Sequence, residues 1–443
     1  MNVEWNQLLS TQRIGQKRDL FPEQSRSAFE QDYDRIIFSH PFRRLQDKTQ
    51  VHPLPEHDFV HTRLTHSLEV SSVGRSLGRK TGEVILQRNP DLAKRFSLVD
   101  LGAIVAAASL AHDLGNPPFG HAGENAISDF FIQHPVGQSV RQMVSEAEWE
   151  DLKKFEGNAQ GFRILNKNRY GLKLTAATLG AFTKYPCPAF FPARDRSKRS
   201  QKKFGFFQTE KNVFADIAAE LGLKKTTDET WLRHPLAFLV EAADDICYSI
   251  IDLEDGCSLG LVSYAEAKEL FEEVITTGKT KLGKLDQLSS REEKIGFLRA
   301  LAIGDLTAEC TGVFLDHEAD ILHGKFDAPL VDFCSRKQAL RKIIEISVEK
   351  IYRSRNVVEI EASGHEVLPG LLDEFVKTGL NLMRRGDSRK YDNLKLLLPP
   401  DVAGSIAEHP ANTYNMLRQV VDFISGLTDR HALSLFRKIK GIG

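Results

Sequence analysis

The sequence has 443 residues, and 59 lysine and arginine residues nearly balance 60 aspartate and glutamate residues. The resulting formal net charge of −1 does not favour a general nucleic-acid-binding or membrane-surface protein, so any anion-binding site should be local. A chain of this length can bury a large core and form two or three domains.

Cysteine usage and hydropathy bear on the location of the protein. The five cysteines lack CxxC spacing, which disfavours a disulfide framework or a cysteine zinc site and fits a reducing compartment. The most apolar run, residues 101–114, is too short to span a bilayer. A cytoplasmic protein without a membrane partner is therefore expected.

Most of the chain is predicted to be helical, because apolar residues recur at spacings of three and four and β-branched alternation is scarce. Ser97 and Asp100 form a capping-box pattern before one helix. The predicted fold class is all-α (mainly α), with one short strand candidate at Val357–Glu361. Helices are expected over residues 63–80, 98–114, 235–253, 261–277, 291–323, 335–353, 366–384 and 412–439.

A basic segment, residues 194–203, holds six basic residues against one aspartate and is bordered by phenylalanines on both sides. Such a run of charge is typical of a solvated loop. It is equally typical of a segment that contacts phosphate or single-stranded nucleic acid. The sequence leaves both alternatives open.

The most informative stretch is residues 111–124, which reads Ala-His-Asp-Leu-Gly-Asn-Pro-Pro-Phe-Gly-His-Ala-Gly-Glu. It places His112 and Asp113 in the last turn of a predicted helix, with His121 and Glu124 in the segment beyond. Mixed imidazole and carboxylate ligands suit Mg, Mn, Fe or Zn without selecting among them. The stretch therefore indicates a metal site.

Two other predicted helices offer further ligands: His66 lies on the apolar face of one, and Asp244 or Asp245 lies in the other. A single histidine on such a face is more often a satisfied core residue. A shared cation would explain all these residues together, because an isolated buried charge costs several kcal/mol. Spacing does not choose firmly between the two acids.

Asp244, Tyr248 and Asp252 follow one another at four-residue intervals, which places them on one helical face. An acid at one end of the row could hold metal while the other two residues face a substrate. A polar seam against another helix is the structural alternative.

Seven ordered segments together resemble the deoxyguanosinetriphosphate triphosphohydrolases, a family of the HD superfamily of metal-dependent phosphohydrolases. The segments are residues 43–51, 62–70, 112–124, 155–161, 203–207, 241–246 and 424–430. A His-Asp dipeptide alone is a weak signal, but seven segments in order across about 390 residues are specific.

The resemblance implies an HD-domain helical core with an additional C-terminal helical region. The implied parts are an N-terminal segment (1–60) that contributes to the active site, the catalytic core (61–255) and a C-terminal region (256–443). The last part would complete the site and supply oligomer surfaces, since the family forms ring-like assemblies, often hexamers.

The resemblance also implies one divalent metal ion per site, either Mg, Mn or another transition metal such as Fe, Co, Ni or Zn. The chain lacks the extra histidines of two-metal HD phosphodiesterases. The chain has four neighbouring candidates, His52, His57, His61 and His66, and only the match to the family's motif selects His66 among them. The implied ligands are His66, His112, Asp113 and Asp244.

The implied reaction is cleavage of a dNTP, and dGTP is the substrate that gives the family its name. Water would attack the α-phosphorus and release a deoxynucleoside and inorganic triphosphate. The metal would withdraw charge from the phosphate. His121 and Glu124 match the catalytic pair of the family, and Glu124 could fix the tautomer of His121. Arg63 matches its α-phosphate arginine. Weaker phosphate candidates, placed by neighbourhood, are Asn158, Lys184, Tyr185 and Lys203.

For the sugar, the resemblance implies that Gln50 and Asp252 hydrogen-bond the 3′-hydroxyl and that Tyr248 packs beneath the ring. A bulky side chain against C2′ would exclude a ribose hydroxyl by shape. Asn116 stands where some dNTP hydrolases of the superfamily have a histidine, so a role of that histidine is not transferred.

Two alternative functions remain from the sequence. One is another HD-domain nucleotide phosphohydrolase, and the other is a metal-containing protein that binds single-stranded DNA through the basic segment. The products of hydrolysis would distinguish the first alternative from a dNTP triphosphohydrolase. Binding of single-stranded DNA without hydrolysis would indicate the second alternative.

Overall fold

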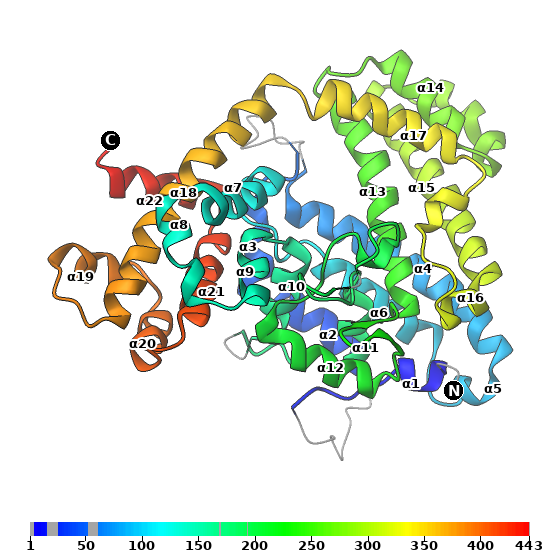
Figure 1. The fold of residues 1–443 in the computed structure, drawn as a ribbon. Helices are drawn as coiled ribbons and strands as arrows, with labels where there is room; N and C mark the ends of the chain where they lie inside the picture. The colour runs from blue at the N-terminus through cyan, green and yellow to red at the C-terminus, as the bar shows by residue number, and fades with distance from the viewer. Residues whose placement is uncertain (1–3, 16–24, 52–60, 168–169, 193, 443) are drawn as a thin grey trace.

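The computed structural model describes residues 4–15, 25–51, 61–167, 170–192 and 194–442. Helices dominate these residues, and two short strands, β1 (Lys225–Thr227) and β2 (Thr230–Trp231), pair antiparallel. The predicted all-α class with at most a short β element is confirmed. The two ends of the chain lie on opposite sides of the molecule (Figure 1).

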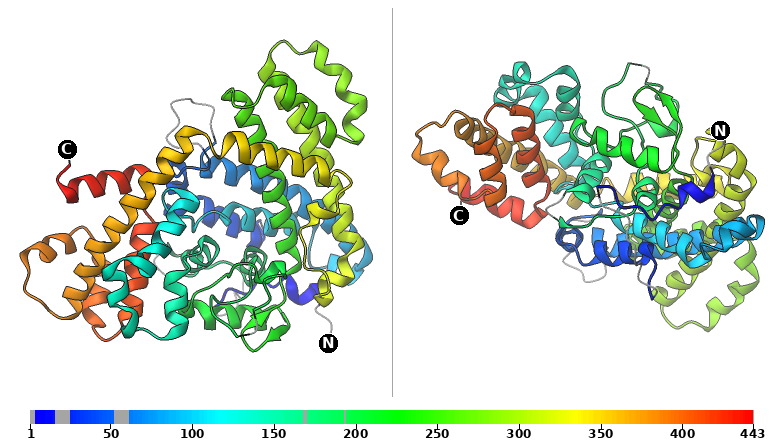
Figure 2. Two further views of the ribbon diagram at one scale, coloured as in Figure 1. Left: turned by 45° about the horizontal axis from the view of Figure 1, so that its top comes forward. Right: turned by 90° about the horizontal axis from the view of Figure 1, so that it is seen from below.

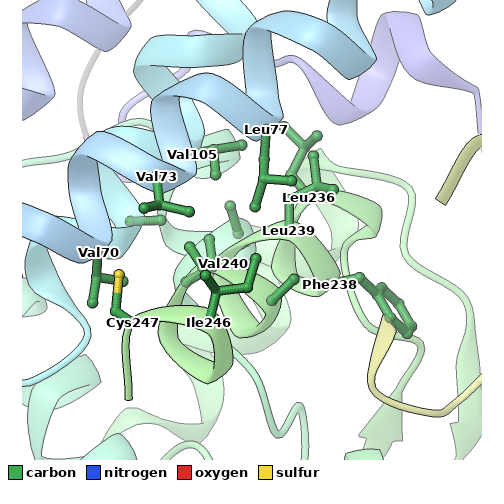
Figure 3. Packing of buried hydrophobic residues seen from close by; sticks show 14 of the residues in the cluster. Val70, Val73, Leu77, Val105, Leu236, Phe238, Leu239, Val240, Ile246 and Cys247 are labelled. Carbon is green, nitrogen blue, oxygen red and sulfur yellow. The ribbon is translucent and has the colours of Figure 1, made fainter. Parts of the chain in front are cut away.

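The first apolar core is built around α4 (Arg63–Arg88), α6 (Leu98–Ala111) and α13 (Pro235–Ser258). Glycines at four-residue intervals on α4 let it approach α6 closely: a Cβ atom at Gly78 would lie 2.7 Å from the carbonyl oxygen of Leu101. Apolar side chains of α4 also meet those of α13 (Figure 3). These contacts hold the three helices rigidly together.

Other elements surround this core. They are α1 (Trp5–Leu8), α2 (Ala28–Ile37), α3 (His40–Arg44), α5 (Pro90–Ala93), α10 (Gly157–Asn166), α11 (Ala176–Phe182), α12 (Lys211–Glu220), α14 (Tyr264–Val274), α15 (Arg291–Asp316), α16 (Glu318–His323) and α17 (Lys337–Ile346). Short 3-10 turns lie at Leu45–Asp47, Arg141–Met143, Arg199–Gln201, Gln208–Glu210, Thr277–Gln287 and Leu330–Phe333, and a π-helical turn lies at Ser347–Ile351.

A second apolar core joins the middle of the chain to its C-terminal part. The helix α18 (Arg355–Met383) packs against α7 (Gly120–Gln133) and α21 (Thr413–Ser425), and α18 spans much of the molecule in Figures 1 and 2. The remaining helices here are α8 (Pro135–Ser139), α9 (Glu146–Lys153), α19 (Arg389–Lys395), α20 (Pro400–Glu408) and α22 (Asp429–Lys440). Part of the expected catalytic core, residues 120–155, therefore packs with C-terminal helices.

The strand expected at 357–361 is wrong, because these residues form the start of α18. Val357 is buried and Ile360 is half-buried, whereas Val358 is 50% exposed, so the inward side chains follow a three-residue interval rather than alternation. Packing of this face overrides the β preference of the branched residues.

Several predicted helix boundaries also shift. The capping box at Ser97 is confirmed, but α6 ends at Ala111, with His112 as its C-cap. The helix expected over 291–323 breaks at His317, and the helix expected over 412–439 breaks at residues 426–428. Among the described helices, none has both the length and the apolar character needed to cross a membrane.

Candidate functional site

A cluster of histidine and aspartate side chains lies where α4, the end of α6 and α13 meet. Ligand atoms of His66, His112 and Asp113 all lie within 4.8 Å of one another. The Asp244 carboxylate on α13 joins them, with its Oδ1 atom 3.4 Å from His66 Nε2 and 3.5 Å from His112 Nε2. The structure thus brings together the four predicted ligands.

Neighbouring groups orient these side chains. A 2.7 Å hydrogen bond joins His112 Nδ1 to the Ser109 carbonyl oxygen, which directs Nε2 towards the acids. Arg63 donates to Asp113 Oδ2 at 2.8 Å, and Asn116 donates to Asp113 Oδ1. Although burial opposes ionisation, the charges of Arg63 and His112 lower the pKa of Asp113. Two imidazoles and two carboxylates form a donor set that fits one divalent cation.

Adjacent acids on α13 have opposite environments. Burial opposes ionisation of Asp244, but the neighbouring His112 and the hydrogen bond with His66 lower its pKa. Burial raises the pKa of Asp245 to about 7, although Lys184 opposes the shift. Asp244 therefore belongs to the histidine cluster, whereas the environment of Asp245 is set by burial and by Lys184.

A cavity of about 630 Å³ opens beside the cluster. Its lining includes these predicted site residues: Gln50, Arg63, His112, Asp113, His121, Glu124, Asn158, Lys184, Tyr185, Lys203, Asp244 and Tyr248. The two predicted residues outside this lining, His66 and Asp252, are buried, with 1% and 3% of their surface exposed. The cavity thus unites side chains from both apolar cores.

Glu124 and His121 project from the first turns of α7. Glu124 Oε1 accepts a 2.7 Å hydrogen bond from the Gly157 N–H, and burial raises the pKa of Glu124. A Cβ atom at Gly157 would lie 2.9 Å from this oxygen, so a glycine permits the contact. Glu124 is therefore held by the Gly157 amide, and the expected contact that would fix the tautomer of His121 stays a prediction.

His121 is exposed towards the cavity. Its partial withdrawal from water and the nearby charges of Lys203 and Arg63 lower its pKa. The neutral imidazole is therefore the main form of this side chain near pH 7.

Buried acids that were not predicted hold the cations of the cavity. Glu156 Oε1 accepts from Asn158 Nδ2 at 2.7 Å and lies 3.2 Å from Lys203 Nζ. Glu241 Oε1 lies 2.6 Å from Arg199 Nε and 3.2 Å from Lys184 Nζ. Both acids lie within or at the edge of segments that resemble the family, but their charge alone did not distinguish them from surface acids.

The basic segment, residues 194–203, divides into inward and outward side chains. Arg194 donates to carbonyl oxygens of its own loop, while Arg199 and Lys203 contact the buried acids described above. The exposed side chains are Arg196, Lys198 and Lys202, and Lys202 lines the cavity. The segment is therefore not a fully solvated loop, because three of its six basic side chains have partners within the protein.

An aromatic pair forms another wall of the cavity. Tyr248 stacks on Tyr352 with ring centroids 5.6 Å apart, and the Tyr352 hydroxyl donates to Asp252 Oδ2. Burial raises the pKa of Asp252 to about 7, although the hydrogen bond from Tyr352 opposes this shift. The buried Oε1 atom of Gln50 has no hydrogen-bond partner within the described residues. Tyr352 was missed because it lies outside the recognised segments.

Comparison with known proteins identifies the family. The HD domain family matches residues 63–155, and the phosphohydrolase-associated domain matches residues 334–438. A "Deoxyguanosinetriphosphate triphosphohydrolase-like protein" of Synechocystis sp. is 43% identical across 99% of this chain and 100% of its own length. The chain belongs to this deoxyguanosinetriphosphate triphosphohydrolase-like family, which confirms the resemblance.

Further relatives cover nearly the whole length of this triphosphohydrolase-like chain. A Pseudomonas aeruginosa protein with the same name is 40% identical across 99% of both chains. A "Deoxyguanosinetriphosphate triphosphohydrolase" of Salmonella typhimurium is 32% identical across 94% of both. Membership of an HD-domain phosphohydrolase family supports a hydrolase and a metal-dependent site, in agreement with the cluster at His66, His112 and Asp113.

Proposed function

We propose that this protein is a metal-dependent dNTP triphosphohydrolase that cleaves dNTPs, dGTP among them, to a deoxynucleoside and inorganic triphosphate. One observation carries the proposal: a single cavity brings together a histidine–aspartate cluster, several cationic side chains and the stacked rings of Tyr248 and Tyr352. The names of the relatives support the same substrate class.

One divalent ion would be held by His66, His112, Asp113 and Asp244. Ligand atoms of His66, His112 and Asp113 lie within 4.8 Å of one another, and the Nε2 atoms of both histidines lie near the Asp244 carboxylate. When bound, the ion would supply electrostatic stabilisation of the reacting phosphate.

Cations around the cluster would bind the triphosphate. Arg63 uses one nitrogen for Asp113, while its buried Nε atom has no hydrogen-bond partner within the described residues. Lys184 and Lys203 also line the cavity, and Asn158 and Lys203 both contact Glu156. Charge-assisted hydrogen bonds of about 1.5–3 kcal/mol each would hold the developing negative charge.

Proton transfer would fall to His121, which lines the cavity on the first turn of α7. Its lowered pKa favours a neutral ring that accepts a proton near pH 7. Glu124, fixed by the Gly157 N–H, would orient the attacking water or the phosphate beside it.

The sugar would lie against Tyr248, whose ring is supported by Tyr352. The unpaired Oε1 atom of Gln50 is a suitable acceptor for the 3′-hydroxyl. Asp252 is engaged by the Tyr352 hydroxyl, so we propose that it acts on the sugar together with that tyrosine.

The decisive experiment is a panel of the four dNTPs with Mg, Mn or Co and with product analysis, each run alone and with a second dNTP to detect activation. Triphosphate and deoxynucleoside in equal amounts are the expected products, and His112→Ala should form neither. Monophosphate or orthophosphate as the primary product would instead indicate another HD phosphohydrolase. Tight binding of single-stranded DNA without hydrolysis of any dNTP would indicate the binding protein. A hexamer and a cytoplasmic location stay predictions.

A further inference from the structure

A junction of three distant segments closes one end of the cavity. It comprises residues 44–50, residues 116–120 and residues 425–430, the last of which join α21 to α22. Lys48 Nζ donates to the carbonyl oxygens of Asn116 and Ser425, at 2.5 and 2.8 Å. Arg44 donates to the Gly426 carbonyl at 2.8 Å. The connection between two C-terminal helices is therefore bonded directly to the site segments.

Asp429 lies at the centre of this junction and is 2% exposed. Its Oδ2 atom accepts the Thr49 N–H at 3.0 Å, and its Oδ1 atom accepts the Phe119 N–H at 3.1 Å. Thr49 precedes Gln50, and Phe119 lies two residues before His121. One carboxylate thus joins the two backbone segments that carry Gln50 and His121.

The backbone of Phe119 needs such a partner. Phe119 begins α7 in the left-handed region, with φ of 63°, which a residue with a large side chain rarely adopts unless its surroundings impose it. Its buried N–H must also be paired, and a phenylalanine side chain cannot cap the helix. Asp429 meets both needs through one oxygen atom.

Capping of α22 does not account for Asp429. Thr428 is the N-cap of α22, and its side chain already accepts the His431 N–H. Both Asp429 oxygens instead point to segments that lie more than 300 residues away in the sequence. The carboxylate therefore serves the site segments rather than its own helix.

We propose that Asp429 is a positioning residue that sets the placement of Gln50 relative to His121 and Glu124. This inference rests on the proposed function, because it assigns these three residues to the same reaction. Asp429 does not itself line the cavity, and it acts on two residues that do, through the backbone amides of Thr49 and Phe119.

The first test compares steady-state turnover of dGTP by Asp429→Asn, Asp429→Ala and wild-type protein. We expect kcat to fall at least tenfold in Asp429→Asn and further in Asp429→Ala, with bound metal unchanged, because Asn retains only one acceptor oxygen. Arg430→Gln is the matched control, since Arg430 makes an exposed 3.0 Å ion pair with Asp47 in the same junction. Wild-type kcat in Asp429→Ala, or an equal loss in Arg430→Gln, would overturn the proposal.

Hydrogen exchange without substrate separates this inference from the proposed function. Peptides covering residues 44–51 and 113–124 should exchange faster in Asp429→Asn, while those covering α6 should keep wild-type protection. Equal acceleration in α6 would indicate a general loss of stability and overturn the positioning role, as would unchanged exchange in both site segments. If the wild-type protein hydrolyses no dNTP, the proposed function fails, and this pattern still decides whether Asp429 organises the two segments.

Discussion

The candidate site has two halves, the metal-cluster half and the α7 half, and they are held in different ways. His66, His112 and Asp244 come from α4, the end of α6 and α13, which pack directly against one another in the first core. His121 and Glu124 come from α7, which belongs to the second core. The start of α7 is tied by hydrogen bonds to Gly157 and Asp429.

This difference affects how each half responds to change. Close packing through glycines gives the metal-cluster half a rigid frame, so single side chains there can be removed without moving their neighbours. Although α7 packs against α18, the placement of its first turn relative to the cavity also depends on hydrogen bonds between distant segments, one of which spans 310 residues of sequence. Its geometry is therefore more sensitive to changes outside the cavity.

The largest expected effect is in the metal-cluster half. Asp244→Ala should lose bound metal and lower turnover by more than about 100-fold, because one ligand of the ion is removed. Asp245→Ala, the adjacent control, should retain the metal. Metal content by elemental analysis and turnover of dGTP check both variants, and equal loss of metal would overturn the choice of Asp244.

In the α7 half, Glu124→Gln should lower kcat by about 100-fold while metal content stays at the wild-type level. The glutamine oxygen can still accept the Gly157 N–H, so α7 should keep its position. Asn125→Ala, at the exposed neighbouring position, should retain full activity. Loss of metal in Glu124→Gln would show that the two halves are not functionally separate.

Tyr248 lies on α13 of the first core, and its ring is the surface against which the sugar is proposed to lie. Tyr248→Ala should raise the ratio of GTP to dGTP turnover by about tenfold, because the ring no longer excludes the 2′-hydroxyl. Tyr264→Ala is a suitable control, since Tyr264 begins α14 outside the cavity lining. An unchanged ratio in competition assays would count against the sugar-packing role.

The smallest effect on activity is expected from Asp151 in the second core. Burial raises the pKa of this side chain to about 7, although hydrogen bonds from Tyr414 and Gln208 oppose the shift. The folded protein thus binds the proton more tightly than the unfolded chain, and stability falls as the pH rises from about 4 to 7.

Asp151→Asn should remove this fall while keeping both hydrogen bonds, which end on one oxygen atom. Its free energy of unfolding, relative to wild type, should increase by about 2 kcal/mol between pH 5 and pH 8. Urea denaturation at the two pH values measures this change. Asp392→Asn, an exposed site on α19, should show no such trend, and a flat difference for Asp151→Asn would contradict the argument.

Sequence patterns predicted the metal-cluster half better than its surroundings. Helical periodicity placed His66 on an apolar face, and the motif at residues 111–124 supplied His112 and Asp113. Only the resemblance to the family selected Asp244 over Asp245. Tyr352 and Glu156 could not be selected in this way, since their contacts with Tyr248 and Lys203 depend on how separate segments pack. The exposed and half-buried basic residues of the segment 194–203 likewise have the same charge and differ in their partners.

The sequence alone determined the helical class, the family and the residue types gathered around the cavity, because these follow from local periodicity and from motifs in a fixed order. The tertiary structure decided that residues 357–361 are helical and that Asp429 bonds to Thr49 and Phe119. Burial against distant segments settled both outcomes, and no local pattern specifies which distant segment will supply a partner for a buried polar group.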